Sequence, residues 1–283
     1  MFKKCVSVLC VALIAAASFM LPVHAQESSI SVSAQAAVVI NADNGQVLYA
    51  KNAENQQAMA STTKIMTALL TLEEAAKENK IVTISEQVAA VEGSSMYLNA
   101  GDQLSLKDLA IGMLTVSGND AAYGAAVAIG GSEEEFAKLM NARAKELGME
   151  HTNFVTASGL DADEHYSTAL DMAKLGAAAI QNEDFLAICS KTQSTATFVN
   201  PPRTQSYSNH NKLLKLYQGC IGIKTGFTKK AGRCLVSAAE RDGVRLVAVT
   251  LNAPDDWNDH IKMFDYGFSQ LSSIRMDGSD TTF

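Results

Sequence analysis

Ser61 and Lys64 are the first candidate catalytic residues along the chain. They lie in the stretch Ser-Thr-Thr-Lys, where a helical pattern begins. Residues three apart lie on one face of a helix, so the hydroxyl and the amine can reach hydrogen-bond distance. A serine beside a base is a nucleophile, and a lysine acts as that base when burial or a second cation lowers its pKa. A helix start also offers unpaired N–H groups to a developing oxyanion. Taken alone, the pattern equally fits a helix cap followed by an ordinary helical lysine.

Two further short motifs lie far along the chain. Residues 117–119 read Ser-Gly-Asn in a gap between two expected helices, and residues 224–226 read Lys-Thr-Gly near the end of a β-rich run. The first is ordinary turn chemistry by itself. In the second, the glycine lets another backbone come close, as when a peptide adds along a strand edge.

The elements that must position these motifs change in type along the chain. An Asn-Gly pair predicts a hairpin over 37–50. Helical spacing predicts mostly helix over 62–189, and the pairs Ser105/Asp108 and Ser132/Glu135 each place a cap residue and an acid three apart, which marks a helix start. Runs rich in β-forming residues return after residue 220. The expected later elements are strands over 220–225, 234–239 and 244–251 and a helix over 255–271. Strands at both ends of a chain predict one antiparallel sheet with an inserted all-α lobe, and a site where the two meet.

Composition excludes several classes of protein. The chain has 283 residues, 47% of them hydrophobic, and a formal net charge of −7. This apolar content is sufficient for a large core and excludes a disordered or collagen-like chain. The acidic balance argues against a nucleic-acid partner.

The N-terminal residues predict export. Lys3 and Lys4 precede an apolar run that ends in a small-residue cleavage pattern, so residues 1–25 are expected to be a signal peptide cleaved after Ala25. The apolar run is shorter than a membrane-spanning helix requires. We therefore expect an exported, extracytoplasmic protein, periplasmic or in the cell-wall space, with membrane association only if the signal stays uncleaved.

Cysteines and histidines give no sign of a metal site or cofactor. The expected mature chain keeps Cys189, Cys220 and Cys234, so at most one disulfide can form, and buried free thiols are the favoured interpretation. Neither a Cys-x-x-Cys clamp nor a His-Glu-x-x-His pattern occurs, and a Walker A sequence is absent. We expect no metal and no cofactor.

The three motifs together are much more specific than each alone. Class A β-lactamases and penicillin-binding proteins carry three such motifs in the same order. The middle residue of their second motif is Asp, where this chain has Gly118. The chain resembles the low-molecular-weight penicillin-binding proteins, the serine-type D-alanyl-D-alanine carboxypeptidases. The resemblance covers roughly residues 36–268 and is carried by the segments 60–67, 93–96, 117–122, 158–161, 209–214 and 222–228.

This resemblance implies the fold class and the domain limits. The expected fold is α/β (α+β), with an antiparallel sheet of about five strands flanked by N- and C-terminal helices and an inserted all-α lobe. Residues 26–283 would form a single transpeptidase-like catalytic domain. Its sheet lobe would cover about 36–60 and 195–271, and its helical lobe about 61–190.

The resemblance also implies a reaction. A peptidoglycan stem peptide would be the substrate, losing its terminal D-alanine through an acyl-enzyme, and β-lactam antibiotics would be covalent inhibitors. Ser61 would attack, Lys64 would take its proton, and Ser117 would relay a proton to the departing amine. Backbone N–H groups of Ser61 and Phe227 would hold the oxyanion. The implied catalytic residues are Ser61, Lys64 and Ser117, and the implied substrate-binding residues are Asn119, Lys224, Thr225, Gly226 and Phe227.

Two departures from the resembled family affect these expectations. Many of its members carry an Arg shortly before the last helix that helps to hold the substrate carboxylate, but residues 252–260 contain none. We therefore expect Thr225 and Lys224 to hold this carboxylate. Trp257 and His260 could line the site, but a core position for Trp257 and a solvated His260 are the favoured interpretation. Relatives also often append a β-rich module and an amphipathic anchoring helix, which we do not expect after the last helix here.

Two other functions remain open from the sequence. A serine β-lactamase of class A needs a Glu to activate water, and Glu164 lies in a suitable stretch, although that stretch has the carboxypeptidase pattern. A non-catalytic penicillin-recognising sensor or cell-wall-binding domain would keep the pocket without releasing D-alanine.

Overall fold

A computed structural model describes residues 30–278, with side chains as far as residue 271. The expected signal peptide lies outside the described residues. The described part begins at Ile30 and leads directly into the first strand, β1, so the N-terminal flanking helix expected from the resemblance is not present between residue 30 and that strand.

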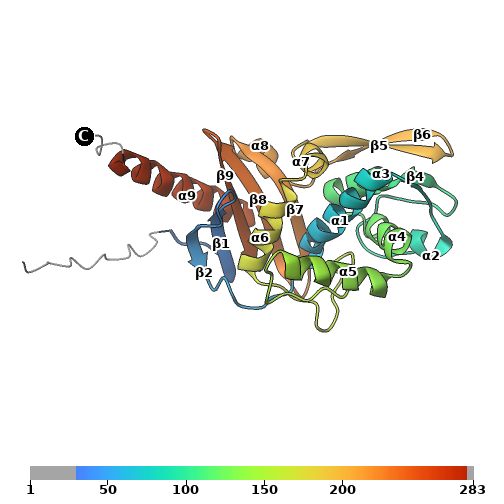
Figure 1. Ribbon diagram of the computed structural model, residues 1–283, viewed down its shortest axis with the longest axis horizontal. Coiled ribbons are helices and arrows are strands. Elements are labelled where there is room, and N and C mark those ends of the chain that lie inside the picture. Colours follow the sequence, from blue (N-terminus) through green and yellow to red (C-terminus); the bar gives the residue numbers. More distant parts are fainter. Residues whose placement is uncertain (1–29, 279–283) are drawn as a thin grey trace, which may run out of the picture.

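A five-stranded antiparallel sheet joins the two ends of the described chain, as predicted (Figure 1). Its order is β2-β1-β9-β8-β7, and every neighbouring pair is antiparallel. The strands are β1 (Ala36–Asn41), β2 (Val47–Lys51), β7 (Cys220–Thr228), β8 (Gly232–Arg241) and β9 (Val244–Leu251). Strand β7 therefore lies at an edge, with one side free for other contacts.

Helices cover both faces of this sheet because its strands are apolar on both sides. Along β8, Leu235 belongs to the cluster under α9 (Asp256–Gly278), whereas Val236 belongs to the cluster that includes α6 (Ala169–Ala179). Successive strand residues point to opposite faces, which explains this alternation. The short helix α8 (Leu213–Leu216) packs beside β7.

The insertion between β2 and β7 is built around one central helix. Helix α1 (Lys64–Lys77) follows the 3₁₀ turn η1 (Ala60–Thr63) and packs against several of its neighbours. The remaining helices are α2 (Glu86–Ala89), α3 (Leu106–Thr115), α4 (Asn119–Gly130), α5 (Glu133–Glu146) and α7 (Glu183–Cys189). The predicted capping box at Ser105 and the predicted cap at Ser132 are both confirmed.

The insertion is not all-α, which corrects the sequence analysis. A second sheet of order β3-β4-β5-β6 lies within it, formed by β3 (Ile81–Thr83), β4 (Gln103–Ser105), β5 (Gln193–Asn200) and β6 (Arg203–Ser208). The hairpin β5–β6 therefore belongs to this second sheet. The sequence analysis had assigned it to the large sheet, because the expected sheet lobe began again at about residue 195. Strands of three residues give no periodic signal, and which sheet a hairpin joins is not a local property of its sequence.

Two histidines are buried as neutral groups. His260, expected to be solvated, is instead buried where α9 faces the sheet, between the hydroxyls of Ser237 and Thr250. His165 contacts the hydroxyl of Thr63 in the loop before α6. Burial lowers the pKa of His260 to about 3. The pKa of His165 is lowered to about 4, and burial is again the largest cause.

We expect the fold to lose stability as pH falls. Each imidazole titrates near pH 6.5 once the chain unfolds, so the stabilisation is complete above that pH and is lost as the pH approaches the folded-state pKa values. Urea unfolding should show a loss of up to roughly 3 kcal/mol per histidine between pH 7 and pH 4.5. His260→Asn should lessen this dependence, whereas His151→Gln, at an exposed position, should leave it intact. Equal stability of the wild type at both pH values would contradict the assignment.

Candidate active site

The first motif lies at the junction of η1 and α1. Lys64 Nζ and Ser61 Oγ are 2.9 Å apart, which is the arrangement that the spacing predicts. Ser61 remains partly accessible, whereas Lys64 is completely buried. The pair therefore presents a hydroxyl outwards and keeps its amine away from water.

The surroundings of Lys64 fix the direction of its lone pair. Besides Ser61, its Nζ contacts Asn119 Oδ1 at 2.7 Å and the carbonyl of Ser158 at 2.6 Å. Both of these oxygens can only accept, so a neutral amine must donate to each of them. The lone pair then points at the one partner that carries a proton, the Ser61 hydroxyl.

Asn119 has its amide orientation determined by a second contact. Its Nδ2 donates to the carbonyl of Glu92 at 2.7 Å, which leaves Oδ1 facing Lys64. The preceding Ser117 adopts a left-handed backbone with φ of 63° in the short connection between α3 and α4. Left-handed conformations of non-glycine residues are uncommon and persist where the surrounding structure demands them.

The third motif supplies a second buried amine from the edge strand β7. Lys224 Nζ donates to the carbonyl of Thr225 at 2.7 Å, and burial lowers the pKa of Lys224 to about 7. The pKa of Lys64 is held well below its usual value, first by burial, then by the charge of Lys224, with Asp120 opposing. Of the two causes that lower the pKa of Lys64, burial is the larger.

One cavity of about 450 Å³ collects the exposed parts of the three motifs. Its walls include Ser61, Ser117, Thr225, Gly226 and Phe227. The other expected site residues, Lys64, Asn119 and Lys224, are buried next to it. All eight residues named from the sequence therefore belong to one region between the large sheet and the helical insertion.

Five residues that the sequence analysis did not assign to the site also line this cavity. They are Ser94, His210, Arg233, Asp256 and Trp257. Trp257 was expected in the core, but it both lines the cavity and packs on the cluster under α9. Ser94 and His210 lie in segments that carry the family resemblance, so the sequence could have indicated that they belong to the site. Arg233 could be found only from the pairing of β7 with β8, which places it opposite Phe227.

The cavity holds no Glu suited to a class A β-lactamase within the described part of the chain. Glu164, the candidate for that role, is exposed and lines a different cavity. The carboxylate that does line the cavity, Asp256, is engaged by Arg233.

Comparison with known proteins agrees with this geometry. The pattern of the D-alanyl-D-alanine carboxypeptidase family matches residues 23–255, a stretch that contains all three motifs. The chain belongs to this family. The resemblance stated from the motifs is thereby confirmed.

Named members of this carboxypeptidase family are similar over most of the chain. D-alanyl-D-alanine carboxypeptidase DacF of Bacillus subtilis is 39% identical over 87% of this chain and 65% of its own length. DacC of Escherichia coli is 37% identical, over 89% of this chain and 66% of its own. The chain thus spans about two thirds of the length of these curated relatives.

A solved structure shares the fold throughout. The crystal structure of the Streptomyces K15 DD-transpeptidase superposes with a TM-score of 0.80 and 31% sequence identity, covering 85% of this chain and 98% of that one. The predicted fold class, of the β-lactamase and penicillin-binding-protein type, is confirmed by this likeness.

In this member of the carboxypeptidase family, Gly226 of β7 lies close to the backbone of η1, and this contact predicts the effect of a substitution. A Cβ at Gly226 would lie 3.0 Å from the backbone nitrogens of both Ser61 and Thr62. Gly226→Ala should therefore push β7 away from η1 and slow penicillin acylation about 10- to 100-fold, because small displacements of reacting groups are costly. Stopped-flow acylation would measure this.

Gly176→Ala is the matched control for that variant. A Cβ there would also have its nearest neighbour at 3.0 Å, but against the Val247 side chain in the core. It should lower stability without slowing acylation, and an unchanged acylation rate in Gly226→Ala would contradict the assignment.

Proposed function

We propose that this chain is a serine D-Ala-D-Ala carboxypeptidase that removes the terminal D-alanine from peptidoglycan stem peptides. The observation that carries the proposal is the hydrogen bond between Ser61 and a buried Lys64 whose lone pair can point only at that hydroxyl. The family assignment supports the substrate class.

Acylation would begin with attack by Ser61 Oγ on the carbonyl carbon of the penultimate D-alanine. The hydroxyl proton passes to Lys64, whose depressed pKa keeps a fraction of the amine neutral. The carbonyl oxygen becomes an oxyanion, and the backbone N–H groups of Ser61 and Phe227 would stabilise it. The proximity of Gly226 to the nitrogen of Ser61 supports this placement.

The acyl-enzyme would then form and break down. The tetrahedral intermediate collapses, the C–N bond breaks, and the nitrogen of the terminal D-alanine takes a proton relayed by Ser117, which lines the cavity. Water attacks the ester carbonyl, and Ser61 Oγ regains its proton as the shortened peptide leaves. A β-lactam would acylate the same serine and stay bound, because its leaving group remains tethered after ring opening.

The contacts of Asn119 favour a different role from the one first expected. Both polar atoms of its amide are used within the protein, by Lys64 and by the carbonyl of Glu92. We infer that Asn119 orients Lys64, in addition to any contact with a substrate amide. Thr225 lines the cavity and would bind the terminal carboxylate.

We also propose one extracytoplasmic catalytic domain over residues 26–283. Residues of the sheet and of the insertion share a continuous hydrophobic cluster, and both line the cavity, which supports a single unit. None of the helices in residues 30–278 has the length and apolar character needed to traverse a bilayer. A stem-peptide substrate would require the domain to act outside the cytoplasm.

A two-substrate assay tests the proposed activity. The wild type should release D-alanine from diacetyl-Lys-D-Ala-D-Ala, lose that activity with benzylpenicillin, and turn nitrocefin over slowly. Fast nitrocefin turnover without D-alanine release would show a β-lactamase instead. A lasting penicillin adduct without D-alanine release would show a non-catalytic sensor.

A further inference from the structure

Arg233 places a permanent positive charge in the wall of the cavity. It lies on β8, one strand in from the sheet edge, where the register sets it opposite Phe227. Together with Ser61 and Thr225 it lines the cavity, and its side chain is 42% exposed. A guanidinium in this place faces the same space as the proposed nucleophile.

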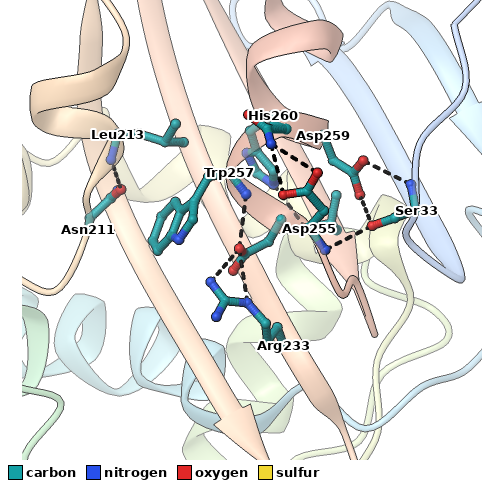
Figure 2. A network of polar contacts seen from close by, with 11 residues as sticks. Ser33, Asn211, Leu213, Arg233, Asp255, Trp257, Asp259 and His260 are labelled. Carbon is teal, nitrogen blue, oxygen red and sulfur yellow. Dashed lines mark hydrogen bonds and ion pairs between the residues drawn. The ribbon is translucent and has the colours of Figure 1, made fainter.

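The guanidinium is held rigidly from one side by Asp256, at the start of α9. Arg233 Nε donates to Asp256 Oδ1 at 3.0 Å and Nη2 donates to the same oxygen at 2.5 Å. That oxygen also accepts the backbone N–H of Trp257, so the carboxylate is itself anchored. Figure 2 shows Arg233 and Trp257 lying close together in this network, and the guanidinium carbon is 5.6 Å from the centre of the indole ring.

The other side of the guanidinium is available to a ligand. Nη1 has no hydrogen-bond partner among the described residues, although guanidinium groups bind carboxylates through two neighbouring nitrogens. The Asp256 side chain is only 4% exposed, so the ion pair anchors the guanidinium in the wall of the cavity that both residues line.

We propose that Arg233 binds the terminal carboxylate of the stem peptide beside Thr225, with Asp256 as its positioning residue. The proposal rests on the carboxypeptidase function proposed above. It replaces the expectation that Thr225 and Lys224 do this alone, because Lys224 is buried, donates to the carbonyl of Thr225 and is not among the residues that line the cavity. The guanidinium also stays charged at every working pH, whereas burial lowers the pKa of Lys224 to about 7.

The chain provides a matched control on the same strand. Arg241 lies at the far end of β8 and pairs with Asp265 of α9, so it also links strand and helix by an ion pair. It lies over Tyr217 and Phe268, outside the cavity of Ser61. If Arg233 served only to join β8 to α9, the two arginines would behave alike.

Kinetics on an acid and an amide substrate test the assignment. Diacetyl-Lys-D-Ala-D-Ala and its C-terminal amide differ only in the carboxylate. Arg233→Gln should lower kcat/KM for the acid about 10- to 100-fold, as expected for a lost hydrogen bond to a charged group, and change the amide little. Arg233→Lys should recover part of the loss, Asp256→Asn should cause a smaller loss, and Arg241→Gln should leave the acid-to-amide preference at the wild-type value.

Four outcomes would overturn the assignment. Equal losses on the acid and the amide would make Arg233 a structural residue, and so would an equal change of preference in Arg241→Gln. An unchanged preference in Arg233→Gln, with an active wild type, would refute Arg233 alone and leave the proposed function standing. A wild type that releases no D-alanine would refute the proposed function, and the role of Arg233 with it.

Discussion

Ser61→Ala is expected to abolish both D-alanine release and covalent labelling by fluorescent penicillin. The variant removes the oxygen that forms the acyl bond, and loss of a serine nucleophile costs on the order of a million-fold in turnover. The fold should be unaffected because the described hydrogen bond of Ser61 Oγ is with Lys64 alone. Labelling is measured by gel fluorescence and turnover by a coupled D-alanine assay.

Ser132→Ala serves as the control for this substitution. Ser132 caps α5 by accepting the backbone N–H of Glu135, away from the cavity. Its loss should cost about 1 kcal/mol of stability and leave labelling intact. Persistent labelling of Ser61→Ala would remove Ser61 from the mechanism.

Lys64→Met is expected to slow acylation about 100- to 10,000-fold, the range associated with loss of a general base. Methionine keeps the length and apolar part of the side chain, and it removes the group that faces the Ser61 hydroxyl. Stability should fall by about 1 to 3 kcal/mol, because Asn119 Oδ1 and the carbonyl of Ser158 lose their donor. Stopped-flow measurement of penicillin acylation gives the rate, and thermal unfolding checks the fold.

The matched control replaces Lys80, whose described side-chain hydrogen bond is to a backbone carbonyl. Lys80 Nζ donates to the carbonyl of Ala128, and Lys80→Met should acylate at the wild-type rate. A mild change in the acylation rate of Lys64→Met would assign the base to another group.

Much of the fold followed from local patterns. The helix after Ser61, the capped helices at Ser105 and Ser132 and the strands that form β7 to β9 were all predicted from spacing and cap residues. Each depends on neighbours within a few residues, which is why sequence alone suffices.

The missed features all depend on partners distant in sequence. Strands β5 and β6 were not predicted, and the sheet that they join includes β3 and β4, which are only three residues long. His260 looked polar, but two hydroxyls on neighbouring strands accommodate it in the core. Arg233 is ordinary in sequence, and only cross-strand register and Asp256 bring it to the cavity.

Peptide mapping of the penicillin adduct tests the central claim, that separate stretches of chain converge to acylate Ser61. Trypsin should yield residues 52–64 as one peptide, in which Ser61 is the only serine. After reaction with benzylpenicillin, we expect this peptide of the wild-type chain to gain the mass of one inhibitor molecule, located by fragmentation on Ser61. An adduct on any other peptide, or none at all, would contradict the account.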